Sequence, residues 1–303
     1  MPLRVLCLHG MGVNADIMRK QTASFRSLLP SFYEFTFVDG GSTCDAAPGV
    51  AEFYPGPYRC WYDTPTTKKV AKAHRRVFAI IRQEGPFDAV MGFSQGASLA
   101  ASMILHHQIE RPSEPPLFRV AIFICSPLPF SSGLHHGIDA RTYFGLKATK
   151  PLSTCRPTKV PEYLIPKDPY FMRGDNEAAH KDSSKQSKKS PAAASAHRSP
   201  HLLNDGHVSV SRKTNQQNDE QISGPHWQMF HPTVDTVRIS IPTAHIGGQK
   251  DFWRPHSNDL MKLCDGRLAS VFEHDGGHEV PKFASEEICD VIETVVAKAD
   301  LCS

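Results

Sequence analysis

The chain contains Gly92-Phe93-Ser94-Gln95-Gly96 between an apolar run, residues 87–91, and a stretch of small residues, 97–101. A serine between two glycines at a strand-to-helix turn is typical of a nucleophile elbow. The glycines let strand and helix approach closely, and the turn lifts the serine hydroxyl above the sheet. A glycine-bordered surface turn is the alternative interpretation, because the pentapeptide alone recurs by chance. The flanking strand and helix patterns favour the elbow, with Ser94 as the nucleophile.

A serine hydroxyl becomes a nucleophile only when a histidine takes its proton and a carboxylate orients that histidine. In folds with such an elbow, the acid and then the histidine follow the serine, each in a loop after a later strand. Residues 237–246 contain a strand-like stretch, which leads to Asp251 through Gly247-Gly248-Gln249-Lys250. The next strand-like run, 268–273, leads to His278. We therefore predict a triad of Ser94, Asp251 and His278.

Other residues compete for the roles of base and acid. His274 leaves its loop before Gly276 and Gly277 can turn an imidazole toward the serine. Asp259 lies inside an apparent helix, and Asp275 lies close to the histidine itself, where a triad acid is unusual. The chain has 16 histidines, so most must be structural or solvated. No histidine or cysteine set shows zinc-ligand spacing, so we predict no metal and no cofactor.

Acyl transfer also needs two backbone donors for the oxyanion. Residues 3–8 form a short apolar run that opens into His9-Gly10-Met11-Gly12, before a helical stretch from Ala15 onward. The amide of Met11 is one candidate donor, and the amide of Gln95, directly after the nucleophile, is the other. A plain strand-to-helix turn is the alternative interpretation of the first loop.

The remaining pattern predicts one α/β domain over residues 1–303. Apolar strands at 35–38 and 120–124, with helices between strands, suit a mostly parallel sheet covered on both faces. The proline-containing segment 128–172 is expected to form a cap or lid. Residues 173–225 are rich in polar residues and poor in apolar ones, so we expect a disordered insertion there.

The insertion has several interpretations that the sequence leaves open. Its basic run, 181–190, could dock an acidic carrier protein, bind nucleic acid or serve as a nuclear-targeting patch. A solvated loop or a retained intron in the gene would look the same. The formal net charge of +3 lies largely in this segment, so it gives little support to a nucleic-acid partner, and we predict none.

Cysteine usage and hydropathy indicate a cytoplasmic protein. The first residues are expected to form a strand already, so we expect no signal peptide, and no apolar run approaches the length of a membrane span. The eight cysteines lack paired spacing, which is typical of reduced thiols. Cys7 and Cys125 are expected to be buried in strands, without a histidine partner.

Several segments together resemble a known family. The chain is similar to the fungal family of small serine hydrolases that includes the ovarian-cancer-associated hydrolase of animals, and most similar to stand-alone thioesterases of polyketide pathways. The resemblance implies an α/β-hydrolase fold and a thioester substrate, an acyl or polyketide chain on the carrier domain of a secondary-metabolite synthase. The matching segments are residues 6–10, 37–40, 53–58, 61–62, 85–97, 245–247 with Asp251, and 276–278.

Two segments depart from the family pattern, residues 41–44 and 124–129, and both are expected to line the acyl pocket. The identity of the acyl chain therefore stays open. A carboxylesterase acting on small oxygen esters, and a non-catalytic binding member of the fold, are the competing functions.

Overall fold

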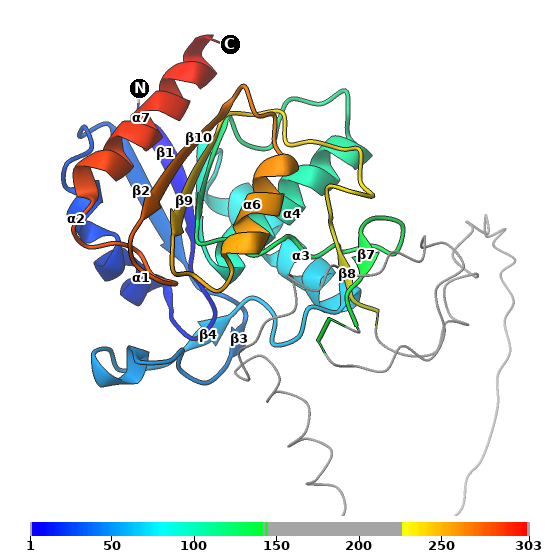
Figure 1. The fold of residues 1–303 in the computed structure, drawn as a ribbon, viewed down its shortest axis with the longest axis horizontal. Coiled ribbons are helices and arrows are strands. Elements are labelled where there is room, and N and C mark those ends of the chain that lie inside the picture. The colour runs from blue at the N-terminus through cyan, green and yellow to red at the C-terminus, as the bar shows by residue number, and fades with distance from the viewer. Residues whose placement is uncertain (1, 142, 145–225, 302–303) are drawn as a thin grey trace, which may run out of the picture. The chain divides into compact units, whose positions relative to one another are not determined.

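The computed structural model describes residues 2–141, 143–144 and 226–301, and these residues contain a six-stranded parallel sheet. The strand order is β10-β9-β6-β5-β1-β2, and every neighbouring pair is parallel (Figure 1). The strands are β1 (Leu3–Leu8), β2 (Tyr33–Val38), β5 (Ala89–Phe93), β6 (Val120–Ile124), β9 (Thr243–Gly248) and β10 (Ala269–His274). This is the α/β-hydrolase fold that the sequence predicts.

The strand order reverses between β1 and β5. The chain runs from β1 to β2 on one side and then returns to β5 on the other, where Cys7 pairs with Met91 and Leu8 with Gly92. Loops that leave the carboxyl ends of β1 and β5 therefore emerge next to each other. Such a switch point is where open α/β sheets bind ligands.

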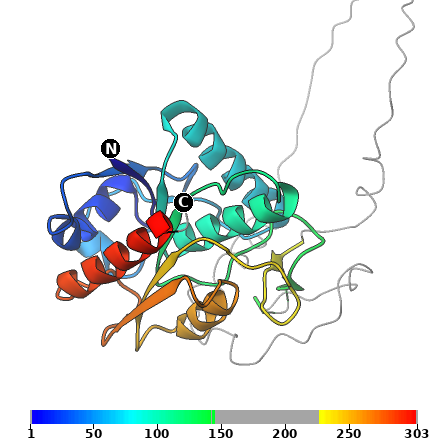
Figure 2. The same cartoon turned by 90° about the horizontal axis from the view of Figure 1, so that it is seen from above.

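Helices cover both faces of the sheet. Helices α1, α2 and α7 pack against one face, and α3, α4 and α6 lie on the other (Figures 1 and 2). Their bounds are α1 (Ala15–Gln21), α2 (Ala23–Arg26), α3 (Thr67–Glu84), α4 (Gln95–Glu110), α6 (Arg254–Lys262) and α7 (Ser285–Leu301), with a 3₁₀ helix, η1, at Val50–Glu52. Two layers of helices keep both faces of the parallel strands away from water.

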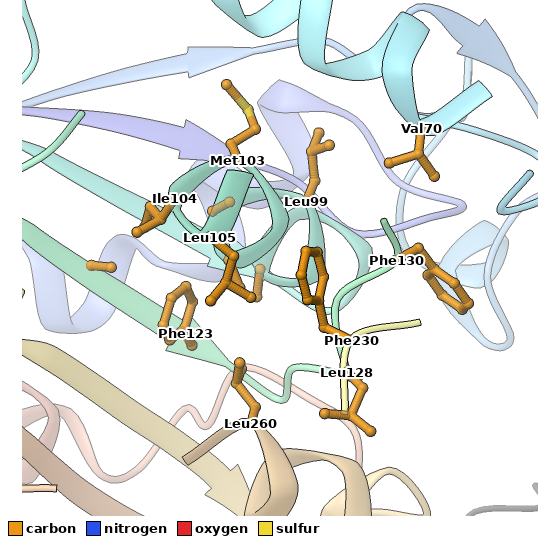
Figure 3. Close-up of a cluster of buried hydrophobic side chains, with 14 of the residues drawn as sticks. Val70, Leu99, Met103, Ile104, Leu105, Phe123, Leu128, Phe130, Phe230 and Leu260 are labelled. Atoms are coloured by element: carbon orange, nitrogen blue, oxygen red, sulfur yellow. The ribbon is translucent and has the colours of Figure 1, made fainter. Parts of the chain in front are cut away.

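Helix α4 is buried over most of its length. It is buried from Gln95 to His107, because the small side chains that follow the elbow let it lie close to the sheet. Leu99 and Leu105 of this helix belong to one cluster of buried hydrophobic side chains with Phe123 of β6 and Phe230 (Figure 3). Burying each such large apolar side chain contributes about 1.5–3 kcal/mol. The packing therefore fixes the helix whose first turn carries the residues around Ser94.

Two small antiparallel pairs lie outside the main sheet. β3 (Ser42–Thr43) pairs with β4 (Arg59–Cys60), and β7 (Ile138–Asp139) pairs with β8 (Gln228–Met229). The second pair begins within the predicted cap, 128–172, which the structure describes only at 128–141 and 143–144. The predicted insertion, 173–225, lies outside the described residues. Within the described part of the chain, no helix combines the length and apolarity needed to cross a membrane.

Candidate active site

Ser94 occupies the turn between β5 and α4 in a strained backbone conformation. Its φ is 50° and its ψ is −116°, although it is not a glycine. A Cβ atom at Gly92 would lie 2.4 Å from the backbone of Ala97, and one at Gly96 would lie 2.0 Å from the carbonyl oxygen of Leu8. Glycine is therefore required at both positions for helix and strands to meet at this turn.

The structure brings the three predicted triad residues together. The hydroxyl of Ser94 lies 2.8 Å from Nε2 of His278, and Nδ1 of the same ring lies 2.9 Å from Oδ2 of Asp251. Because a carboxylate can only accept, Nδ1 carries the ring hydrogen and Nε2 accepts the hydrogen bond from the serine. The chain of donors and acceptors is the one that activates a serine for nucleophilic attack.

The acid and the base are held by contacts between their loops. The amide of Gln249 donates to the carbonyl of His274 at 2.8 Å, and the amide of Lys250 donates to the carbonyl of Gly276 at 2.9 Å. The second carboxylate oxygen of Asp251 accepts a 2.8 Å hydrogen bond from the amide of Trp253. Both oxygens of the buried carboxylate are thus engaged, so its orientation toward the histidine is fixed.

Two aromatic rings lie beside the imidazole of His278. The ring centroids of Phe93 and Phe252 are each 5.3 Å from that of the histidine. Phe93 is buried, whereas Phe252 is 43% exposed. These contacts limit rotation of the ring while its outer edge stays open to solvent.

The competing residues lie elsewhere. His274 is buried, and its Nδ1 accepts a hydrogen bond from the amide of Gly276 at 3.1 Å. Asp259 is buried in α6, where it pairs with Lys262 and lies 3.4 Å from Nε2 of His231. Asp275 is exposed. None of these three rivals is hydrogen-bonded to Ser94 among the described residues.

A small cavity opens beside Ser94. It has a volume of about 60 Å³, and both candidate oxyanion donors, Met11 and Gln95, line it together with the serine. Gln95 is the first residue of α4, and the first amides of a helix have no acceptor within that helix. The amide is therefore free of the helix ladder and lies at its positive end.

Four aromatic side chains form part of the remaining cavity wall. Tyr62, Phe130, Phe144 and Trp253 line it, with Tyr62 and Phe130 packed edge to face at 6.2 Å between centroids. These residues come from four separate parts of the chain. No hydrophobic periodicity links these four aromatic residues, so the sequence does not predict that they line one cavity.

A buried hydrogen-bond network connects the elbow to the loop after β1. Oε1 of Gln95 accepts from the amide of Trp61 at 2.8 Å, and Nε2 donates to the carbonyl of Tyr62 at 2.7 Å. The indole of Trp61 donates to the carbonyl of His9 at 2.8 Å. Burial lowers the pKa of His9, so its ring stays neutral and Nε2 accepts from the amide of Gly40 at 2.9 Å. The two loops that carry Met11 and Gln95 are thereby linked through buried side chains.

The two segments that depart from the family pattern differ in their position. Ser42 and Thr43 form β3 and pair with β4. Residues 41–44 were expected to line the acyl pocket, but they are not among the residues that line the cavity. Pro127 does line it. Cys125 directly follows β6 rather than lying within it as expected, and its sulfur lies within 4.8 Å of a ring nitrogen of His278.

The sheet, the elbow and the arrangement around Ser94 define the class as α/β-hydrolases. Residues 1–162 and 172–288 match the model of the family described as serine hydrolase (FSH1). The chain therefore belongs to this serine hydrolase family, as its sequence motifs indicate.

Named relatives span nearly the whole chain. Esterase alnB of Emericella nidulans is 29% identical, covering 93% of this chain and 92% of alnB. Hydrolase FUB4 of Fusarium oxysporum f. sp. lycopersici is 28% identical, covering 97% of this chain and 99% of FUB4. Among solved structures, a carboxylesterase from Mesorhizobium loti aligns with a TM-score of 0.47 at 10% identity, covering 96% of this chain and 88% of that one.

Proposed function

We propose that this serine hydrolase is a thioesterase that releases an acyl or polyketide chain from the carrier domain of a secondary-metabolite synthase. The observation that carries the proposal is the hydrogen-bonded series from Ser94 through His278 to Asp251, at the edge of an apolar cavity. Family membership supports hydrolysis at a serine. The thioester substrate is supported by the resemblance of the sequence to polyketide-releasing thioesterases.

The first half of the reaction is acylation of the serine. Nε2 of His278 takes the hydroxyl proton as Ser94 Oγ bonds to the thioester carbonyl carbon. The amides of Met11 and Gln95 donate to the resulting oxyanion. The carbon–sulfur bond then breaks, and the sulfur leaves as a thiol with the proton from His278. Asp251 stabilises the positively charged imidazole that exists between these two steps.

The second half hydrolyses the acyl-serine. A water molecule gives one proton to His278 while its oxygen bonds to the acyl carbon, and the same two amides again hold the oxyanion. The bond to Ser94 breaks, the proton returns to the serine, and the carboxylic acid leaves. Each step uses side chains and amides of the described residues.

The cavity wall indicates an apolar acyl group. Tyr62, Phe130, Phe144 and Trp253 offer aromatic surface, and the cavity is about 60 Å³ in volume. An acyl chain there would be removed from water next to the nucleophile.

The cytoplasm is the proposed location, and the six cysteines among the described residues are all free thiols, which suits a reducing compartment.

A carboxylesterase is the second candidate, because the relative alnB is named an esterase. The same triad cleaves oxygen esters, so a matched pair of substrates is needed. The kcat/KM values for a thioester and an oxygen ester of one acyl group, each divided by its rate of hydroxide hydrolysis, give the comparison. A higher normalised value for the thioester is expected. A higher value for the oxygen ester would favour the carboxylesterase.

A further inference from the structure

A thiol lies behind the acid and the base of the triad. The sulfur of Cys125, a carboxylate oxygen of Asp251 and a ring nitrogen of His278 all lie within 4.8 Å of one another. Cys125 is fully buried, the side chain of Asp251 is 1% exposed, and that of His278 is 21% exposed. The group is therefore nearly enclosed, with the histidine providing its contact with solvent.

The backbone fixes the position of this thiol. Cys125 has a φ of 49°, and with Ser94 it is one of two non-glycine residues with positive φ in the described part of the chain. Its amide donates to the carbonyl of Ile246 at 2.8 Å, and its sulfur lies 3.4 Å from the carbonyl oxygen of Glu279. These contacts tie the end of β6 to β9 and to the loop that carries His278.

We propose that Cys125, Asp251 and His278 form a binding site for a soft divalent cation of the zinc type, and that the bound ion inhibits the enzyme. Thiolate, imidazole and carboxylate are the three protein ligand types of Zn²⁺. Bond lengths of about 2.0–2.3 Å place neighbouring tetrahedral ligands about 3.3–3.8 Å apart. Because the ligand atoms lie up to 4.8 Å apart, metal binding needs a closure of up to about 1.5 Å for the widest pair.

Charge and hardness favour zinc over the abundant divalent ions. One thiolate and one carboxylate together balance the two positive charges of the metal. Ca²⁺ and Mg²⁺ prefer six or more oxygen ligands, and this group offers one carboxylate. On binding, the Cys125 thiol releases its proton, and the ring proton of His278 moves to the nitrogen that does not bind the metal.

Inhibition follows from the identity of the ligands. An imidazole that binds zinc no longer takes the proton of Ser94, and a carboxylate that binds zinc no longer orients the imidazole. The inhibitory effect rests on the proposed function, whereas the metal site itself does not. A chelator such as EDTA restores activity, because no covalent bond has changed.

The first test measures activity against free Zn²⁺ for metal-free protein, with each variant compared with its own zinc-free rate. We expect reversible inhibition of the wild type and at least a 10-fold higher zinc requirement for Cys125→Ala, with no effect of Mg²⁺ or Ca²⁺ on either. Cys7→Ala is the matched control, because Cys7 is a buried thiol of the same sheet. Equal zinc sensitivity of wild type and Cys125→Ala would overturn the proposal.

The second test reads the metal without turnover. In the Ser94→Ala protein, competition with a chromogenic chelator counts bound Zn²⁺, and Co²⁺ reports sulfur ligation through its thiolate charge-transfer band. When Cys125→Ala is added to this protein, we expect one fewer tightly bound Zn²⁺ ion and loss of the thiolate–Co²⁺ charge-transfer band. Cys125→Ser takes its place if the alanine variant does not fold. An unchanged zinc count or an absent band in the parent overturns the metal site. Zinc binding by the Ser94→Ala protein, together with a folded wild type that hydrolyses no ester or thioester, would instead overturn the proposed function.

Discussion

The side-chain carbonyl of Gln95 accepts a 2.8 Å hydrogen bond from the amide of Trp61, which lies 34 positions earlier in the chain. The same side chain donates to the carbonyl of Tyr62 at 2.7 Å. Gln95 thus joins the start of α4 to the segment that carries part of the cavity wall. Its backbone amide is also a proposed oxyanion donor, so the same residue both positions the start of α4 and takes part in the proposed catalysis.

Replacing Gln95 by leucine should weaken both stability and catalysis. The change leaves the amide of Trp61 and the carbonyl of Tyr62 buried without partners, at a cost of about 1–3 kcal/mol for each group. We expect kcat to fall by about 10-fold or more, because a displaced donor stabilises the oxyanion less well. Urea unfolding and steady-state kinetics measure the two effects. Ser98→Ala is a control that changes another cavity residue of α4 but leaves the hydrogen bonds of the Gln95 side chain in place. Kinetics equal to the wild type in Gln95→Leu would contradict the role.

Replacing Gly96 by alanine should prevent stable folding. The new Cβ would lie 2.0 Å from the carbonyl oxygen of Leu8, a backbone atom of β1 that is held between β5 and β2. We expect a loss of more than about 4 kcal/mol in the free energy of unfolding, measured by urea denaturation. Gly266→Ala is the matched control, since a Cβ there meets no atom within 4 Å. Similar stability of the two variants would show that the elbow is looser than the structure indicates.

Acidification should destabilise the protein through its buried histidines. Burial lowers the pKa of His74 to about 3 and that of His245 to about 4. Below pH 6.5 the unfolded chain therefore binds protons that the folded protein does not. The free energy of unfolding falls as pH falls from 6.5 toward 4, by about 1.4 kcal/mol per pH unit for each such histidine.

The variant His74→Asn isolates one of these contributions. Urea unfolding at pH 7 and at pH 5 should show a smaller loss of stability for this variant than for the wild type. His135→Asn is the control, because the ring of His135 is exposed. The same pH dependence in His74→Asn and wild type would contradict the assigned pKa.

Local signals made the elbow, and the chain order of the three residues predicted as a triad, predictable from sequence. The glycines around Ser94 are required by contacts within a few residues of the turn, so the motif alone identifies the turn. Parallel strands then place the loops after β9 and β10 at the edge of the sheet where the elbow lies, which is why Asp251 and His278 could be proposed. The strand expected within residues 237–246 begins at Thr243, directly after Pro242, which has no amide hydrogen to donate.

Contacts between distant segments were not predictable. The cavity wall and the hydrogen bond between Gln95 and Trp61 depend on how the loops fold over the sheet. The spacing of residues in the sequence does not predict how these loops fold. The proximity of Cys125 to His278 depends on β6 lying next to β9, a strand order that the hydrophobic pattern does not specify. The sequence shows no zinc-ligand spacing because the possible ligands, Cys125, Asp251 and His278, lie far apart in the chain and come together only in the fold.

Replacing Asp251 by asparagine should remove most activity while preserving the fold. The amide can donate to Nδ1 of His278, which favours the tautomer that cannot accept the proton of Ser94. We expect kcat to fall by about 10⁴-fold, measured with a chromogenic ester. A loss below 10-fold in a folded variant would assign the acid to another residue.

The most direct measurement is reaction with a fluorophosphonate probe, followed by mass spectrometry of the labelled peptide, on wild type and Ser94→Ala. A serine activated by His278 should attack phosphorus and carry the adduct, and the variant should carry none. An adduct on another residue, or no adduct on wild-type protein whose circular dichroism shows a folded state, would contradict Ser94 as the nucleophile.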